Sequence, residues 1–107
     1  MKFIVDIDGT ICTTKHGDYN NSKPDLKMIS MINNLFDNGH TIHYYTARGT
    51  VTGIDWYSLT KSQLVDWGVK FHELMMGKPE ADFFIDDKAV NPHFMKDIMK
   101  KLMGISS

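Results

Sequence analysis

Short apolar runs alternate along the chain with segments whose apolar residues recur at helical spacing. The first run, at residues 2–6, contains three consecutive apolar residues, two of them β-branched, and predicts a strand buried on both faces. The same reasoning predicts strands within 69–75 and at 41–46 and 81–85, and helices at about 24–37, at about 55–67 and from Asn91-Pro92 to Gly104.

The resulting order β-α-β-α-β-β-α predicts an α/β layered fold with a mainly parallel sheet. Without repeats, low-complexity tracts or linkers, residues 1–107 are expected to form one domain. Pro24 is expected to be the first helical residue, with Leu26 on the apolar face of that helix. Residues 9–23 are polar and irregular, which predicts a loop or a short hairpin folded over Asp6 and Asp8.

Composition narrows the class of protein only slightly. Apolar residues make up 42% of the chain and charged residues 23%, as in ordinary globular proteins. The net charge of −1 gives no electrostatic reason to expect nucleic acid or an anionic membrane as partner. A single cysteine, Cys12, rules out an internal disulfide, and no apolar run reaches membrane-spanning length. Lys2 is followed at once by an acidic motif, so no signal peptide is expected and we predict a cytoplasmic protein.

The most informative motif is Asp6-Ile7-Asp8-Gly9, at the carboxyl end of the first strand. Ligands of parallel α/β sheets bind outside this end of the strands. Buried carboxylates are costly unless they are paired or bind metal, so Asp6 and Asp8 call for a cation. Asp8-Gly9 is also a hairpin-turn signal. A calcium loop fits poorly, because counting from Asp6 places Gly9 fourth rather than sixth, and Gly17 rather than Glu twelfth.

Further polar residues are expected at the same edge of the sheet. Thr46 and Arg48 end the second strand, Lys78 precedes the fourth, and Asp86-Asp87 follow it. Carboxylates suit a hard cation, while lysine and a hydroxyl stabilise a phosphoryl group during its transfer. The sequence therefore predicts a joint site for magnesium and phosphate.

This pattern resembles the haloacid dehalogenase (HAD) superfamily, whose members are mostly phosphohydrolases. The resemblance rests on Asp-x-Asp-Gly-Thr at 6–10, Thr46, Lys78-Pro79 and the Asp-Asp pair at 86–87. The segments 45–48, 77–79 and 85–89 look like those of the small, uncapped phosphatases often called capsular-polysaccharide-biosynthesis phosphatases. The resemblance to the HAD superfamily implies a HAD-like Rossmannoid three-layer sandwich without a cap domain.

The resemblance also implies roles for the acidic residues. Asp6 would be the nucleophile and form an aspartyl-phosphate. Asp8 would protonate the leaving oxygen and then activate water. Mg²⁺ would be held by the carboxylates of Asp6 and Asp86 and by the backbone carbonyl of Asp8, with Asp87 binding directly or through water.

Other positions would hold the substrate. Thr46 and Lys78 would contact the transferred phosphoryl group, and Lys78 is also open to interpretation as a solvated lysine. Backbone N–H groups near Gly9 and Thr10 would add donors, and Ala47 and Arg48 would lie on the substrate side. Arg48 would contact a second phosphate or a sugar, or else would be a surface arginine closing a turn.

The leading hypothesis is a magnesium-dependent phosphomonoesterase acting on a sugar phosphate or saccharide precursor. The chain between Asp8 and Thr46 is too short for a cap domain, so the site is expected to be open to large substrates or closed by a second copy of the chain. The alternatives are a nucleic-acid 3′-end phosphatase, disfavoured by the near-neutral charge, and a non-enzymatic module that binds metal and phosphate.

Overall fold

The computed structural model describes residues 1–50, 52–77 and 83–85. Within these residues, four parallel strands form one sheet in the order β5-β4-β1-β6. Their bounds are Lys2–Asp6 for β1, Thr41–Thr46 for β4, Glu73–Met76 for β5 and Phe83–Ile85 for β6. The central position of β1 places its carboxyl end between two neighbouring strands, where parallel sheets bind ligands.

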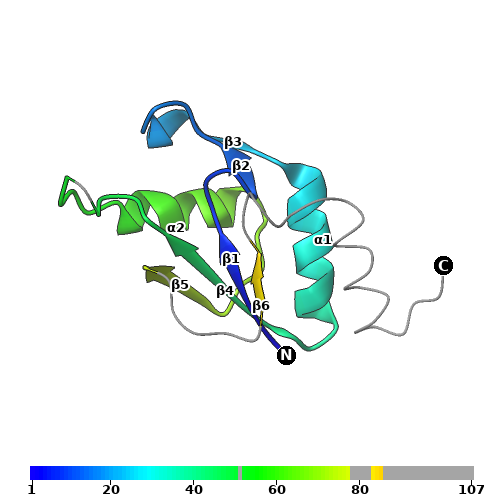
Figure 1. The fold of residues 1–107 in the computed structure, drawn as a ribbon. Coiled ribbons are helices and arrows are strands. Elements are labelled where there is room, and N and C mark those ends of the chain that lie inside the picture. The colour runs from blue at the N-terminus through cyan, green and yellow to red at the C-terminus, as the bar shows by residue number, and fades with distance from the viewer. Residues whose placement is uncertain (51, 78–82, 86–107) are drawn as a thin grey trace.

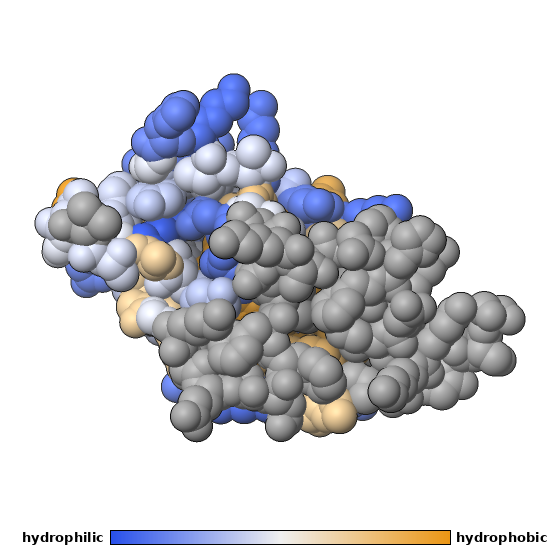
Figure 2. All heavy atoms as spheres, viewed as in Figure 1, coloured by the Kyte–Doolittle hydropathy of each residue, from blue (hydrophilic) through white to orange (hydrophobic). Residues whose placement is uncertain are grey.

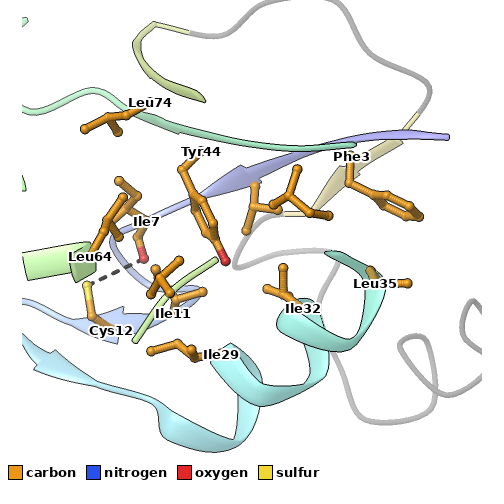
Figure 3. Packing of buried hydrophobic residues seen from close by; sticks show 13 residues of the cluster. Phe3, Ile7, Ile11, Cys12, Ile29, Ile32, Leu35, Tyr44, Leu64 and Leu74 are labelled. Carbon is orange, nitrogen blue, oxygen red and sulfur yellow. Dashed lines mark hydrogen bonds between the residues drawn. The ribbon is translucent and has the colours of Figure 1, made fainter. Parts of the chain in front are cut away.

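Two helices cover one face of this sheet. Helix α1 spans Leu26–Asp37 and helix α2 spans Tyr57–Asp66. One apolar cluster joins both helices to alternate residues of β1 and β4, and Figure 3 shows α1 side chains directed toward the strands around Tyr44. Each buried aliphatic side chain of this kind contributes about 1.5–3 kcal/mol. The cluster includes Phe3, Val5, Ile29, Ile32, Leu35, Ile42, Tyr44 and Leu64.

A small antiparallel hairpin follows β1, as the polar segment 9–23 predicted. Strand β2 (Cys12–Thr13) pairs with β3 (Lys23–Pro24), and a short 3-10 helix, η1 (Tyr19–Asn21), lies between them. Figure 1 places this segment beyond the carboxyl end of β1, and Figure 2 shows a hydrophilic projection in the same part of the view. The hairpin therefore lies at the edge of the sheet where the acidic motif emerges.

The predicted start of the first helix is wrong by two residues. Pro24 belongs to β3, opposite Cys12, and the helix begins at Leu26. Asp25 is the N-cap, and its carboxylate accepts a hydrogen bond from the Met28 N–H at 3.1 Å. Leu26 is 65% exposed and does not belong to the apolar face. A carboxylate cap and the hairpin pairing together displace the proline from the first turn.

The other boundaries differ by a few residues. Helix α2 begins at Tyr57 and ends at Asp66. Strand β5 begins at Glu73 rather than near Val69, which lies before the strand and packs into the apolar cluster. Residues 9–45 are all described and contain only β2, η1, β3, α1 and most of β4, so this part of the chain holds no cap domain. The helix predicted from Asn91-Pro92, which would form the third layer, lies outside the described residues.

In the described part of the chain, neither helix has the length and apolar character required to cross a bilayer.

Candidate active site

The register of the sheet brings the ends of β1 and β4 together. Asp6 lies opposite Tyr45 in the parallel ladder, so Thr46 stands one residue beyond Asp6 on the neighbouring strand. Asp8 lies two residues beyond the end of β1, and Arg48 lies two residues beyond the end of β4. The structure thus gathers Asp6, Asp8, Thr46 and Arg48 at the same edge.

The turn after β1 is closed by its own backbone. The Ile7 carbonyl accepts hydrogen bonds from the N–H groups of Thr10 (3.2 Å) and Ile11 (3.1 Å), and the Gly9 N–H donates to the Cys12 carbonyl at 2.9 Å. Gly9 has a φ of +86°, a conformation that glycine adopts without strain. Because the N–H groups of Gly9 and Thr10 are engaged within the turn, their use as phosphate donors stays a prediction that requires the turn to rearrange.

Arg48 forms a bidentate ion pair with Asp8. Its Nε donates to Oδ2 of Asp8 at 2.9 Å, and its Nη2 donates to Oδ1 at 2.8 Å. The Arg48 side chain is fully buried, whereas that of Asp8 is 29% exposed. Two parallel N–H···O bonds between charged groups make a strong and directional contact. The carboxylate of Asp8 is therefore oriented by the loop that follows β4.

The remaining donors of the guanidinium group are also engaged. Nη1 donates to Thr60 at 3.1 Å and to Gln63 at 2.7 Å, and Nη2 donates to Ser22 at 3.3 Å. The ring centroid of Tyr19 lies 4.6 Å from Cζ, a cation–π contact. All five N–H groups of the side chain thus have partners inside the protein.

These contacts settle one of the two alternatives for Arg48. The prediction of a surface arginine is wrong, because the side chain is buried between the hairpin and α2. A direct contact with substrate stays a prediction, and in this structure Arg48 has no N–H group left to make it. The observed role is to bind and orient Asp8.

Asp8 is held in its ionised form. Burial alone would raise the pKa of its carboxyl group, but the hydrogen bonds from Arg48 and Thr14, the charge of Arg48 and a weak contact with Cys12 together lower the pKa below the ordinary value of 3.8. The Thr14 hydroxyl donates to Oδ1 at 2.7 Å. At neutral pH this arrangement provides a proton acceptor rather than a proton donor.

Cys12 lies next to Asp8 but is unsuited to nucleophilic chemistry. Burial, followed by the negative charge of Asp8, raises the pKa of its thiol to about 11. Its Sγ makes weak contacts of 3.6 Å with the Ile7 carbonyl and with Asp8. Because the thiolate is the reactive form, a thiol that stays protonated at neutral pH has a packing role here.

Thr10 and Thr46, the two threonines predicted to lie at the site, are both buried. The Thr46 hydroxyl accepts a hydrogen bond from the Arg48 N–H at 3.0 Å, and its own hydrogen has no acceptor among the residues that the structure describes. The Thr10 hydroxyl has no partner within the described part of the chain. One oxygen of Asp6 accepts a hydrogen bond from the Ile7 N–H at 2.8 Å, which fixes the orientation of that carboxylate.

A pocket of about 340 Å³ lies beside this edge of the sheet, between the hairpin segment and the loop that joins β4 to α2. Ala47, the residue that follows Thr46, forms part of its wall. The other side chains that shape it are His16, Tyr19, Thr52, Ile54 and Trp56.

The predicted metal site is described only in part. Asp6 and Asp8 are in place, whereas Asp86, Asp87 and Lys78 lie outside the described residues. Among the residues that are described, no three His, Cys, Asp or Glu side chains form a metal-binding group. Asp6 supplies carboxylate oxygen, which is the donor chemistry that a hard cation prefers. The carboxylate of Asp8 is engaged by Arg48, so the group of Asp8 predicted to bind the cation is its backbone carbonyl.

The residues that surround Arg48 were not predicted from the sequence. Thr60 and Gln63 lie three residues apart on α2, so they share a face with the buried Leu64. Because buried polar groups are hydrogen-bonded, these two residues are the one signal in the sequence that a polar partner lies opposite this face. Ser22 and Thr14, from the hairpin, carried no such signal.

The parallel sheet, the acidic turn after β1 and the neighbouring threonine define a HAD-like α/β fold. A structural-genomics target from Vibrio cholerae is similar to the chain, with 30% sequence identity, a TM-score of 0.71 and coverage of 96% of each chain. The chain therefore belongs to the same family as that protein.

A second solved structure shares the fold at greater distance. It is the D,D-heptose 1,7-bisphosphate phosphatase from B. bronchiseptica, complexed with magnesium and phosphate, which has 20% sequence identity and a TM-score of 0.52. The match covers 94% of this chain and 63% of the phosphatase, so the chain spans less than two thirds of that protein. No model of a known family matches the sequence, and neither does any curated protein.

Proposed function

We propose that the protein is a magnesium-dependent phosphomonoester hydrolase in which Asp6 attacks phosphorus. The observation that carries the proposal is the juxtaposition of Asp6 and Asp8 with Thr46 and Arg48 at the carboxyl edge of β1 and β4. The HAD-like fold and the solved phosphatase that shares it support the same class of reaction.

The reaction would proceed in two steps. A carboxylate oxygen of Asp6 forms a bond to phosphorus, the ester oxygen leaves with its electron pair, and an aspartyl-phosphate results. Water then attacks the phosphorus, the bond between Asp6 and phosphorus breaks, and inorganic phosphate is released. The Thr46 hydroxyl would donate to a phosphoryl oxygen, with its oxygen oriented by the Arg48 N–H.

Asp8 is prepared for the second of these steps. Its ionised carboxylate can take a proton from the attacking water. The hydrogen bonds from Arg48 and Thr14 lower the pKa of this carboxyl group and so favour the ionised form. The first step needs a proton only when the leaving alcohol is a poor leaving group. We therefore propose that Asp8 acts as the base in the second step, and that aryl phosphates with good leaving groups are turned over without an acid. A sugar hydroxyl is a poor leaving group, so with a sugar phosphate a protonated Asp8 would first donate its proton to the leaving oxygen, and the resulting carboxylate would then take a proton from the attacking water.

Magnesium would neutralise the charge of the phosphoryl group when bound. The residues proposed to hold it are Asp6, the backbone carbonyl of Asp8, Asp86 and Asp87. Lys78 is proposed to contact the same phosphoryl group. These assignments follow from the resemblance to the HAD superfamily.

The substrate class is proposed to be a sugar phosphate or a saccharide precursor. The absence of a cap between residues 9 and 45 supports an open site that admits large molecules. The heptose bisphosphate substrate named for the B. bronchiseptica protein supports a phosphorylated sugar. A likeness to the uncapped capsular-polysaccharide-biosynthesis phosphatases belongs to the same proposal.

The experiment that tests the proposal measures phosphate release from an aryl phosphate such as p-nitrophenyl phosphate. Wild-type protein with Mg²⁺ should hydrolyse it, EDTA should abolish turnover, and excess Mg²⁺ should restore it. Calcium in place of magnesium serves as the matched control, because a larger and more flexible coordination sphere positions the nucleophile less well. Turnover that persists in EDTA would contradict the role of the metal.

A further inference from the structure

The pocket beside the acidic edge is placed to receive the group that carries the phosphate. Ala47 forms part of its wall and directly follows Thr46, whose Cα is therefore about 3.8 Å away. Its opposite wall comes from the hairpin segment, which also supplies Thr14 and Ser22 to the network around Asp8. A phosphoester held at Thr46 would therefore lie close to this pocket.

The aromatic wall of the pocket is already ordered. The rings of Tyr19 and Trp56 meet edge to face, with centroids 5.0 Å apart and an interplanar angle of 75°. Tyr19 is fixed further by Arg48, which stacks on its ring, and by Gln63, whose Nε2 donates to its carbonyl. Because these side chains are held by the protein, a ligand would not have to order them on binding.

The other wall is closed by a tight loop. Gly49 has a φ of +85°, and a Cβ built on it would lie 2.1 Å from the Ile54 carbonyl oxygen and 3.1 Å from the Trp56 ring. The Gly53 N–H donates to the Gly49 carbonyl at 2.8 Å. A side chain at residue 49 would clash with the Ile54 carbonyl, so this close approach within the loop, which forms one wall of the pocket, requires glycine.

The chemistry of the lining selects for a neutral ligand. The described residues that line the pocket include two aromatic rings, the 53% exposed Ile54, the Thr52 hydroxyl and the His16 imidazole, and among them there is no lysine, arginine, aspartate or glutamate. A second phosphate would require a cation here. A volume of about 340 Å³ lies at the small end of the range for ligand sites.

We infer that this pocket binds a neutral pyranose ring, the leaving group of a sugar monophosphate. The ring's apolar face would pack on Trp56, and its hydroxyl groups would reach Thr52 and His16. This inference rests on the proposed function, because it names the substrate class of the same site. It favours a hexose monophosphate over a sugar bisphosphate whose second phosphate would occupy the pocket.

The test uses the Asp6→Asn protein with Mg²⁺, so that substrates bind without turnover, and measures affinity by isothermal titration calorimetry. The probes are inorganic phosphate, glycerol 3-phosphate, glucose 1-phosphate and glucose 6-phosphate. We expect at least one glucose phosphate to bind about tenfold more tightly than the two ringless probes. In Trp56→Ala the advantage of the ring should disappear while phosphate affinity is unchanged.

Matched variants separate the pocket from general effects. Trp56→Phe keeps an aromatic face and should retain part of the advantage, whereas Val65→Ala, on the exposed side of α2 away from the pocket, should retain all of it. If all four probes bind equally, or if Trp56→Ala weakens phosphate and glucose phosphate alike, the pocket inference is wrong. Tighter binding of adenosine monophosphate than of either glucose phosphate would also overturn it. If no probe binds to the Asp6→Asn protein and the wild-type protein releases phosphate from none of the phosphoesters, the proposed function itself fails.

Discussion

Arg48 and Asp8, which are 40 residues apart in the sequence, form a bidentate ion pair with N···O distances of 2.9 and 2.8 Å. The pair joins the turn after β1 to the loop after β4, and Thr60 and Gln63 extend it to α2. One buried guanidinium group therefore orients the proposed base of the reaction and ties three elements of the fold together.

Replacing Asp8 should destabilise the protein as well as lower its activity. In Asp8→Asn the buried guanidinium loses its counter-charge, and an uncompensated buried charge costs about 3–5 kcal/mol. We expect a loss of about 3 kcal/mol in the free energy of unfolding, at the lower end of that range, because Asp8 is 29% exposed. Urea unfolding followed by circular dichroism measures this. Asp66→Asn, the same change on the exposed surface of α2, should be neutral, and an equally small effect of Asp8→Asn would contradict the account.

Weakening the ion pair should move the acid limb of the pH–rate profile to higher pH. Burial alone would raise the pKa of Asp8, but the hydrogen bonds from Arg48 and Thr14 and the charge of Arg48 lower it, so in the wild-type protein the base is protonated only at a lower pH than an ordinary aspartate. Arg48→Lys keeps a positive charge but loses the bidentate geometry, so the pKa of Asp8 should rise and protonation should inactivate the base earlier. The measurement is the pH dependence of kcat for p-nitrophenyl phosphate, whose acid limb should lie at higher pH in Arg48→Lys than in the wild-type protein. An acid limb that stays in place would show that Asp8 is not the titrating base.

Tyr44 offers a stability test that is independent of catalysis. Its side chain is fully buried in the apolar cluster, and its hydroxyl has no hydrogen-bond partner within the described part of the chain. Burial also raises the pKa of this phenol well above its ordinary value, so the group stays neutral. Tyr44→Phe removes an unsatisfied polar atom and should increase the free energy of unfolding by about 1 kcal/mol. Tyr57→Phe, at an exposed position on α2, is the control; destabilisation by Tyr44→Phe would mean that the hydroxyl is satisfied in solution.

Much of the fold follows from local patterns, and the failures have local causes too. The apolar runs of β1 and β4 and the helical spacing of Ile29, Ile32 and Leu35 predict elements that the structure contains. The rule that proline opens a helix was wrong at Pro24, because pairing with Cys12 and the cap at Asp25 compete for the same residues.

The candidate site is predictable only as far as the motif reaches. The carboxyl ends of adjacent parallel strands must meet, which is why Asp6 and Thr46 could be placed together from the sequence. The burial of Arg48 and its pairing with Asp8 could not be predicted. Its partners come from the hairpin, the turn after β1 and α2, and no periodic pattern in the sequence links them. The pocket lined by Tyr19 and Trp56 likewise exists only once two loops are folded against each other.

The central claim is that Asp6 attacks phosphorus, and the most direct measurement compares phosphate release from p-nitrophenyl phosphate by wild-type protein and by Asp6→Asn with saturating Mg²⁺. Asn is nearly isosteric but is not a nucleophile, so we expect kcat to fall by at least a thousandfold, of the order seen when a catalytic nucleophile is removed. Asp18→Asn, an exposed change in the hairpin segment, should leave kcat unchanged. Turnover by Asp6→Asn at the wild-type rate would contradict the covalent mechanism.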